Sequence, residues 1–199
     1  VAIFSSLILV LGIFLSNRAD SPWMYVLFYA TTLGIAILYV HARAGLTPPL
    51  SWREMGLNRP GWKSVYYGIG GGLLLYGCAT IFLRSGYYPP QQHDIHGASN
   101  WQATVPLLVG TLFQASAEEV IFRGYLLKRL ESKLGVLKAV ALSSILFGAL
   151  HAPYFTGPTL YGIILGWICI RTQSLATPII AHFLFNSSLI ILTLEFTLR

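Results

Sequence analysis

The stretch TLFQASAEEVIFRGYLL, residues 111–127, places two adjacent carboxylates inside an otherwise apolar segment. Glu118 and Glu119 lie near its middle, and Arg123 follows four residues after Glu119. Residues four apart share one face of an α-helix, so Glu119 and Arg123 can form an ion pair. Arg123 can neutralise only one of the two carboxylates well. The stretch therefore predicts an apolar helix that carries one paired acidic side chain and a second one available for chemistry.

Ionisable side chains inside an apolar span are costly in a bilayer, which makes them candidate functional groups. A carboxylate held in such surroundings can serve as a general base near neutral pH. The structural alternative is that Glu118, Glu119 and Arg123 form a buried salt-bridge staple between helices. Whether these residues are functional or structural depends on the polar residues in the other apolar segments.

The whole chain has the composition of a membrane protein. Hydrophobic residues make up 55% of the 199 residues and charged residues 10%, against about 45–50% and 25% in soluble domains. This excludes a soluble enzyme, a disordered chain and a disulfide-stapled secreted module. Cys78 and Cys169 both lie in apolar stretches and form no disulfide framework. The 13 basic residues are too scattered for a phosphate-binding stripe, so we expect no nucleic-acid partner.

Apolar segments recur along the chain at lengths near the roughly 20 residues that a membrane-spanning helix needs. They cover 1–16, 22–41, 62–83, 104–128, 137–151, 158–171 and 175–197. We therefore predict an all-α, multi-pass membrane protein, with about seven transmembrane helices in one bundle and a single domain over residues 1–199. Val1 lies inside an apolar run, and we expect the true N-terminus to lie further upstream.

Most basic residues lie in every second connection between the apolar segments, which places them on one side of the membrane. Most belong to the connections after the second, fourth and sixth segments: Arg43, Arg53, Arg59, Lys63, Lys128, Arg129, Lys133, Lys138 and Arg171. The other connections hold Arg18 and Arg84. Because cytoplasmic loops carry an excess of Lys and Arg, this pattern places the N-terminal end inside and Arg199 outside.

Two connections and one span have compositions of their own. Residues 44–62, rich in proline, predict an interfacial loop or a short amphipathic helix on the inner face. Residues 84–103, which include His93, Asp94 and His96, predict an irregular, solvated outer loop. Gly68 and Gly72 form a small-xxx-small pair, which predicts close packing of the third span against a neighbouring helix.

Histidines occur in two further apolar segments. His151 follows Phe147 by four residues, and His182 and Asn186 lie one turn apart on one helix face. Taken alone, His151 fits an interfacial residue past a helix end, and the His182–Asn186 pair fits a polar staple between helices. Together with the carboxylates and Arg123, however, they hold nearly all the intramembrane polarity of the chain. At about 1.5 Å rise per residue their depths can coincide, so we predict one site in a membrane-embedded cavity.

These residues resemble the three motifs of the CPBP family, the CAAX-protease-and-bacteriocin-processing or Abi proteins. The motifs EExxxR, FxxxH and HxxxN stand here as Glu118-Glu119-Val-Ile-Phe-Arg123, Phe147-Gly-Ala-Leu-His151 and His182-Phe-Leu-Phe-Asn186. Three motifs in the family's order, each on its own apolar helix, are a specific signal. The resemblance covers roughly residues 105–190. It implies a catalytic core over 104–199 that follows variable spans over 1–103, in a multi-pass protein of a bacterial cytoplasmic membrane.

The resemblance implies an intramembrane endopeptidase that acts on a membrane-associated protein or peptide near its terminus. CAAX-type, bacteriocin-type and C-terminal sorting-tail processing are the activities it suggests. Glu118 is expected to activate the attacking water with help from His151, while His182 and Asn186 receive the developing oxyanion. Glu119, Arg123 and Phe147 are expected to support these four catalytic residues.

Three alternatives stay open at this point. Glu118, His151 and His182 could together hold a zinc ion, although no HExxH motif occurs. The chain could be a non-catalytic immunity or membrane-partner protein on the same fold, against which the intact EExxxR motif argues. It could also carry a haem between His151 and His182, a function in which the paired carboxylates have no role.

Overall fold

The computed structural model describes residues 22–44, 50–84, 101–151 and 153–197, and these ranges contain helices and turns without any strand. The helices are α2 (Pro22–Ala44), α3 (Trp62–Arg84), α4 (Trp101–Glu119), the π-helix η1 (Val120–Leu127), α5 (Lys128–Leu134), α6 (Val136–Ala149), α7 (Thr156–Thr172) and α8 (Ala176–Thr197). The all-α prediction is confirmed for this part of the chain.

Every predicted apolar segment from residue 22 onward corresponds to a helix, with α4 and η1 together forming the fourth. The segment 1–16 and nearly all of the 84–103 loop lie outside the described residues. Trp23–Ala42 and Thr104–Leu134 are long and apolar enough to cross a membrane, by length and composition. Val136–Ala149 and Ala176–Ile191 are apolar but shorter. The number of spans therefore stays a prediction.

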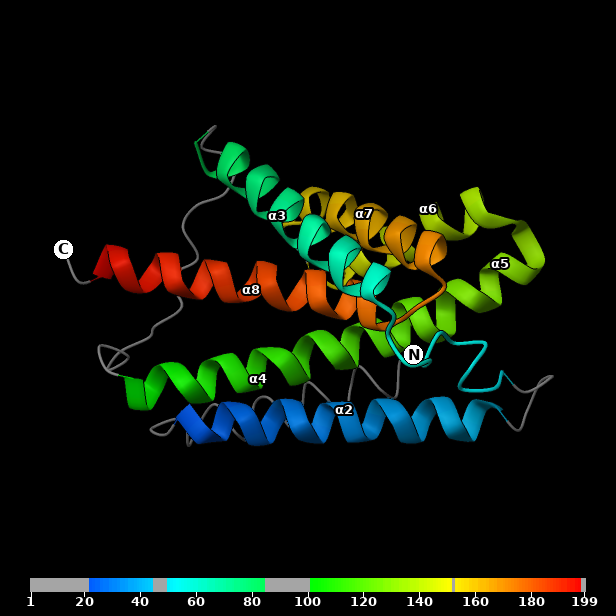
Figure 1. The fold of residues 1–199 in the computed structure, drawn as a ribbon, viewed down its shortest axis with the longest axis horizontal. Coiled ribbons are helices and arrows are strands. Elements are labelled where there is room, and N and C mark those ends of the chain that lie inside the picture. The colour runs from blue at the N-terminus through cyan, green and yellow to red at the C-terminus, as the bar shows by residue number, and fades with distance from the viewer. Residues whose placement is uncertain (1–21, 45–49, 85–100, 152, 198–199) are drawn as a thin grey trace.

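The helices pack as a bundle whose neighbours come from distant parts of the sequence. In Figure 1, α2 and α4 run side by side in the same direction, and α8 lies along α4 in the opposite direction. Helix α3 crosses over α8, and α6 pairs with α7. If each successive apolar segment crosses the membrane, the second and fourth spans run in the same direction and the seventh runs in the opposite one. The directions of α2, α4 and α8 agree with this.

The packing of α3 on α8 depends on glycine. A Cβ atom added at Gly68 would lie 2.8 Å from the Cβ of Ile180, and one at Gly72 would lie 3.1 Å from the carbonyl oxygen of Ala181. Such separations are shorter than ordinary carbon contacts, so larger residues would force the two helices apart. The predicted close packing of this small-xxx-small pair is confirmed.

The connections with most of the basic residues meet at one end of the bundle. The Asn58 amide donates to the carbonyl oxygen of Gln173 at 3.2 Å, and Lys128 Nζ donates to Gln173 Oε1 at 2.9 Å. Residues from the second, fourth and sixth connections thus lie together, as the predicted topology requires. Residues 50–61 form turns rather than an amphipathic helix, and the Leu175 N–H donates to the carbonyl oxygen of Gly56 at 2.8 Å.

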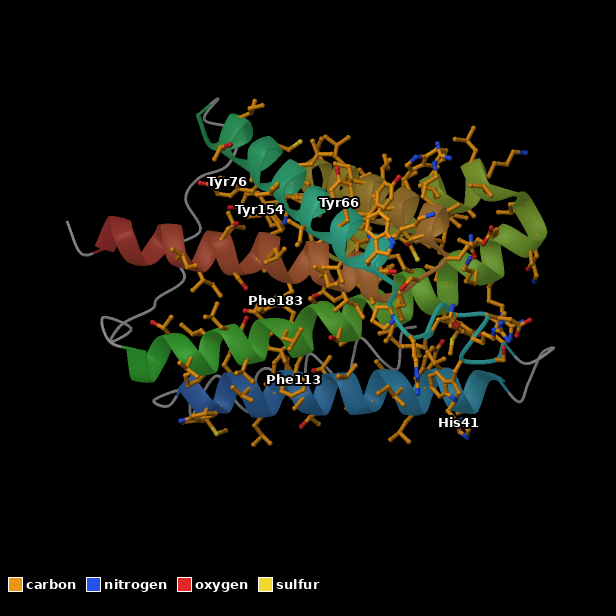
Figure 2. All side chains as sticks on the ribbon, in the orientation of Figure 1. His41, Tyr66, Tyr76, Phe113, Tyr154 and Phe183 are labelled. Carbon is orange, nitrogen blue, oxygen red and sulfur yellow. The ribbon has the colours of Figure 1, made fainter. Side chains whose placement is uncertain are left out.

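The bundle buries a charged pair inside its apolar core and exposes large apolar side chains on its outer surface. Arg123 and Glu119 are among the largest fully buried side chains, whereas Leu137 and Trp62 are exposed by 77% and 74%. The outer surface carries many more large apolar side chains, including Tyr66 on α3 (Figure 2). A soluble domain rarely exposes apolar area on this scale. The distribution supports insertion in a membrane.

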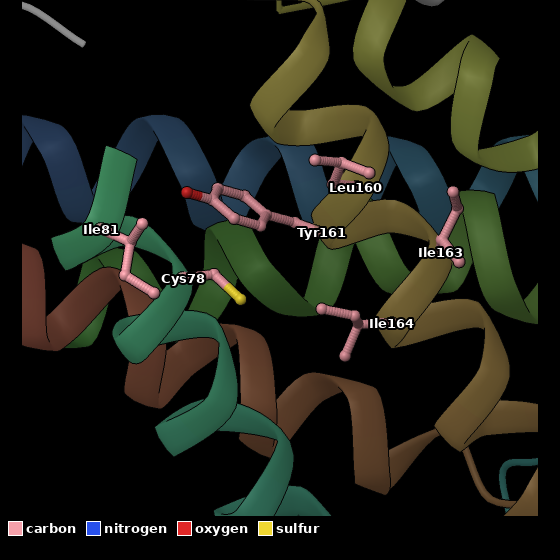
Figure 3. Close-up of a pocket in the computed structure, with 6 residues that line it drawn as sticks. All are labelled: Cys78, Ile81, Leu160, Tyr161, Ile163 and Ile164. Atoms are coloured by element: carbon pink, nitrogen blue, oxygen red, sulfur yellow. The ribbon is translucent and has the colours of Figure 1, made fainter. Parts of the chain in front are cut away.

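An apolar groove of about 360 Å³ lies between α3 and α7 (Figure 3). Its lining consists of Cys78, Ile81, Leu160, Tyr161, Ile163 and Ile164. None of these residues belongs to the predicted site, and the groove has almost no polar surface to orient a reacting group. The candidate chemistry is therefore elsewhere in the bundle.

Candidate active site

The predicted site residues come from four elements of the fold. Glu118 and Glu119 end α4, Arg123 lies in η1, Phe147 and His151 lie in and just after the last turn of α6, and His182 and Asn186 lie on α8. Helix α8 packs against α4, and α6 packs against η1. The fold therefore brings the three motif helices together.

The EExxxR motif spans the junction between an α-helix and a π-helix. Helix α4 ends at Glu119, η1 begins at Val120, and the chain continues directly into α5. π-Helical segments are rare and occur frequently at functional sites, because the extra residue in the turn changes which side chains share a face. This feature was not predictable from the sequence, since no pattern in the apolar run distinguishes it from a regular α-helix.

Glu119 is the centre of a buried polar cluster. Its Oε1 accepts a hydrogen bond from Arg123 Nη1 at 2.8 Å and another from His182 Nδ1 at 2.8 Å. Arg123 Nη2 also donates to the carbonyl oxygen of Gly162 on α7 at 3.3 Å. Glu119 and Arg123 are 0% and 1% exposed. The predicted Glu119–Arg123 pair is confirmed, and it also fixes His182.

The hydrogen bonds of the two histidines assign their tautomers. His151 Nδ1 lies 2.8 Å from the carbonyl oxygen of Phe147, which can only accept, so Nδ1 carries the hydrogen. Glu119 Oε1 already accepts from Arg123, so we likewise assign the hydrogen to His182 Nδ1. In the neutral rings, both Nε2 atoms then carry lone pairs.

Both Nε2 atoms face the carboxylate of Glu118. Glu118 Oε2 lies 4.0 Å from His151 Nε2 and 3.9 Å from His182 Nε2. These separations are too long for direct hydrogen bonds, but one bridging water can span them. Glu118 Oε2 is buried and makes no hydrogen bond within the described part of the chain. The prediction that Glu118, His151 and His182 lie together is confirmed.

Phe147 packs against the residues around it through its ring. Its centroid lies 4.5 Å from that of the His151 ring, 6.0 Å from that of the His182 ring and 4.5 Å from Arg123 Cζ. The Phe122 ring meets it edge-on at 5.1 Å. A buried aromatic ring in contact with both imidazoles and the guanidinium restricts their positions, and its face also attracts the cation.

Asn186 is the predicted site residue that no hydrogen bond ties to the others. It lies one helical turn after His182 on α8 and is partly exposed, and its side chain makes no hydrogen bond to the residues that the structure describes. Its amide is therefore available as a donor. The structure leaves its proposed oxyanion role as a prediction.

The three side chains are spaced more widely than the ligands of one zinc ion. Ligand atoms that bind one tetrahedral zinc ion at about 2.0–2.2 Å lie roughly 3.3–3.6 Å from each other, whereas the two Nε2 atoms stand 3.9 and 4.0 Å from Glu118 Oε2. Over the described ranges, no group of three or more His, Cys, Asp or Glu side chains could hold a metal ion.

Comparisons with known proteins bear on the same region. Residues 100–188 match the family model described as type II CAAX prenyl endopeptidase Rce1-like. A Bacillus subtilis (strain 168) protein named "Putative membrane peptidase YdiL" is 32% identical over 95 residues, which is 46% of this chain and 39% of that protein. Residues 100–188 are therefore similar to the CPBP family, whose motifs they carry. The chain thus aligns with well under half of this relative's length, and no solved structure matches the chain.

The matched region, residues 100–188, contains all three motifs, but two other side chains also take part in the contacts around Glu118. Gln114 Nε2 donates to Glu118 Oε1 at 3.2 Å, and Tyr25 Oη donates to Gln114 Oε1 at 3.1 Å. Gln114 lies within residues 100–188, whereas Tyr25 belongs to α2. Neither residue was predictable as part of the site, because a glutamine or a tyrosine within an apolar helix gives no signal that separates function from packing.

Proposed function

We propose that the protein is an intramembrane endopeptidase that hydrolyses a peptide bond near the membrane-associated terminus of a protein or peptide. The observation that carries this proposal is the convergence of Glu118 Oε2 with the Nε2 atoms of His151 and His182. The similarity of residues 100–188 to the CAAX prenyl endopeptidase family model supports a membrane peptidase in general. The glutamate-activated mechanism rests on the geometry.

In this mechanism the attacking water binds between Glu118 Oε2 and His151 Nε2. One water hydrogen points to the carboxylate, and the other points to the lone pair of the imidazole. As the water oxygen bonds to the carbonyl carbon of the substrate, Glu118 takes its first proton, and a tetrahedral intermediate forms. Glu118 then delivers that proton to the departing amine, so the carboxylate serves as base and acid in turn.

The developing oxyanion requires donors on the opposite side of the substrate carbonyl. Before the attack, His182 takes up a proton from solvent at Nε2 and becomes an imidazolium, which the Glu119 carboxylate at its Nδ1 stabilises. The Nε2–H group of His182 and the amide of Asn186 are then the donors to the oxyanion. Donors that are already oriented where charge develops supply a large part of typical enzymatic rate enhancement.

The site suits a substrate that approaches the cluster from the side of Glu118 and His151. The His151 side chain is 36% exposed and Glu118 23%, whereas Glu119 is fully buried, so the reacting side of the cluster is the accessible one. The proposed substrates belong to one of three classes: CAAX-type tails, bacteriocin-type peptides or C-terminal sorting tails. The large apolar side chains exposed on the bundle support a multi-pass protein, which we place in a bacterial cytoplasmic membrane.

The two other functions fit the geometry less well. A non-catalytic partner protein has no need for a partly exposed carboxylate directed at two oriented imidazoles. A haem held by His151 and His182 would have its macrocycle between their Nε2 atoms, and the Glu118 carboxylate lies against both of those atoms. The peptidase proposal uses every group in the cluster.

The test compares membrane peptides from cells that express the wild-type protein or Glu118→Gln. Mass spectrometry should find new peptide termini that depend on Glu118. The matched control is Glu131→Gln on α5, which removes the same charge from a carboxylate that binds Lys128 and should leave the new termini in place. Identical termini with wild type and Glu118→Gln would contradict the proposed function.

A further inference from the structure

A side chain of α2 reaches the candidate base through one intermediate residue. Tyr25 Oη donates to Gln114 Oε1 at 3.1 Å, and Gln114 Nε2 donates to Glu118 Oε1 at 3.2 Å. Gln114 lies on α4 one turn before Glu118, whereas Tyr25 lies outside the residues that match the family model. A continuous chain of hydrogen bonds thus joins α2 to the site.

The donors and acceptors in this chain allow one orientation of the Gln114 amide. A carboxylate only accepts, so the NH2 group of Gln114 must face Glu118 and its oxygen must face Tyr25. The Tyr25 hydroxyl supplies the hydrogen that this oxygen accepts. Reversing the amide would set its oxygen against the carboxylate. The Tyr25 hydroxyl therefore stabilises the amide orientation that binds Glu118.

Holding one oxygen of Glu118 determines where the other points. With Oε1 bound by Gln114, Oε2 is the oxygen that faces the Nε2 atoms of His151 and His182. The terminal torsion of a glutamate side chain is otherwise broad, so a free carboxylate samples many orientations. A base works only while it is aligned with the group that it deprotonates.

Helix α4 is shaped to receive Tyr25. A Cβ atom added at Gly110 would overlap the Tyr25 ring, so the ring fits only because residue 110 has no side chain. Gly110 lies one turn before Gln114, where α2 packs along α4. The Tyr29 ring meets the Tyr25 ring edge-on at 4.6 Å. Tyr25 is therefore held in place by packing as well as by its hydrogen bond.

We propose that Tyr25 is a positioning residue that acts through Gln114 to keep the Glu118 carboxylate directed at His151 and His182. This inference rests on the proposed function, in which Glu118 activates the attacking water. It assigns part of the site to α2, which the three motifs do not include.

Kinetics of three variants test whether Tyr25 acts through Gln114. Tyr25→Phe keeps the ring and removes the hydroxyl, and Gln114→Leu removes the amide. Each should lower kcat roughly 3- to 10-fold, as the loss of one hydrogen bond does, with KM unchanged. The double variant should be no slower than Gln114→Leu alone. Additive losses, or full activity of Tyr25→Phe, would overturn the proposal.

Infrared spectroscopy without substrate separates a failure of this proposal from a failure of the proposed function. Subtracting the spectrum of Glu118→Gln isolates the carboxyl band of Glu118, whose frequency depends on its hydrogen bonds. Tyr25→Phe and Gly110→Ala should both shift this band even if no peptidase activity exists. An unchanged band in Tyr25→Phe would overturn the positioning role, whatever the protein's activity.

Tyr66→Phe is the matched control for both measurements. Tyr66 lies on α3 and is 68% exposed, and its ring packs edge-on against Tyr67 at 5.9 Å. The same loss of a hydroxyl there should change neither kcat nor the Glu118 band. Equal effects of Tyr66→Phe and Tyr25→Phe would show that the response is not specific to the chain through Gln114, and would contradict the proposal.

Discussion

His182 Nδ1 lies 2.8 Å from Glu119 Oε1, and this contact divides two adjacent glutamates into different roles. Glu119 is fully buried and binds the Nδ1 side of the imidazole, whereas Glu118 is partly exposed and faces the Nε2 side. Glu119 therefore orients the His182 ring, and Glu118 faces the Nε2 atom of this ring on the accessible side of the cluster. The shared oxygen of Glu119 also accepts from Arg123, which ties this orientation to the buried ion pair.

Glu119→Gln should reduce kcat by roughly 10²-fold or more while the protein remains inserted. An amide at this position no longer stabilises an imidazolium and can bind either tautomer of His182, and a wrong tautomer is costly in comparable carboxylate–histidine pairs. The measurement is kcat against a cleaved peptide, with Glu131→Gln as the control for loss of a glutamate charge. Near wild-type activity of Glu119→Gln would show that His182 needs no carboxylate partner.

Asn186→Ala should lower the rate roughly 10²- to 10³-fold, as the removal of one oxyanion donor does. Asn186 makes no hydrogen bond within the described ranges, so its removal leaves no partner unsatisfied, and stability should change little. Ser188→Ala on the same helix is a suitable control, because Ser188 Oγ donates to the backbone oxygen of Phe185. Full activity of Asn186→Ala would exclude the amide as an oxyanion donor.

Activity should persist after exhaustive treatment with a zinc chelator. The reason is the spacing of the donors: Glu118 Oε2 stands 3.9 and 4.0 Å from the two Nε2 atoms, a wider arrangement than a shared zinc shell provides. The assay compares cleavage before chelation, after chelation and after zinc is added back. Loss of activity that zinc restores would assign the reaction to metal chemistry.

The sequence predicted helix positions well because apolar content decides them in this chain. Each apolar segment from residue 22 onward is a helix, and the glycine pair at Gly68 and Gly72 correctly predicted a close helix contact. Which helices become neighbours was not predictable in this way. The parallel packing of α2 on α4 depends on the fit between the Tyr25 ring and Gly110, and neither residue alone indicates it.

The charged residues of the candidate site were predictable from the sequence alone. Glu118, Glu119 and Arg123 stand out because ionisable residues in an apolar helix need a reason. The histidines required the motif pattern as well, since each has an ordinary structural explanation by itself. The second partner of Glu119 and the π-helix after it were not predictable, because they follow from hydrogen-bond geometry that residue spacing does not determine.

Gly68→Ala should destabilise the protein, and Gly70→Ala should not. A Cβ atom at residue 68 would lie 2.8 Å from Ile180 Cβ, whereas one at residue 70 would have no atom within 4 Å. Overpacking of this kind costs about 1–3 kcal/mol, while glycine to alanine at an open helix position gains up to about 1 kcal/mol. Thermal melting in detergent should therefore shift in opposite directions for the two variants. Equal shifts would show that α3 does not pack on α8 through Gly68.

Arg123→Ala and Glu118→Gln should separate stability from chemistry. Removing Arg123 leaves the Glu119 carboxylate buried without its cation, and it also breaks the bond to the carbonyl oxygen of Gly162. Deleting one partner of a buried pair typically costs about 3–5 kcal/mol, so Arg123→Ala should melt at a lower temperature as well as lose activity.

Glu118→Gln removes a charge instead of a compensating partner. Its Oε2 has no hydrogen bond to lose within the described part of the chain, and the glutamine oxygen can still accept from Gln114 Nε2. The variant should therefore abolish cleavage while its melting temperature stays equal to or above that of the wild type. Melting in detergent and cleavage are measured side by side on both variants. If Glu118→Gln unfolds the protein while Arg123→Ala leaves it stable, then Glu118 belongs to the structural ion-pair cluster and the base must be sought elsewhere.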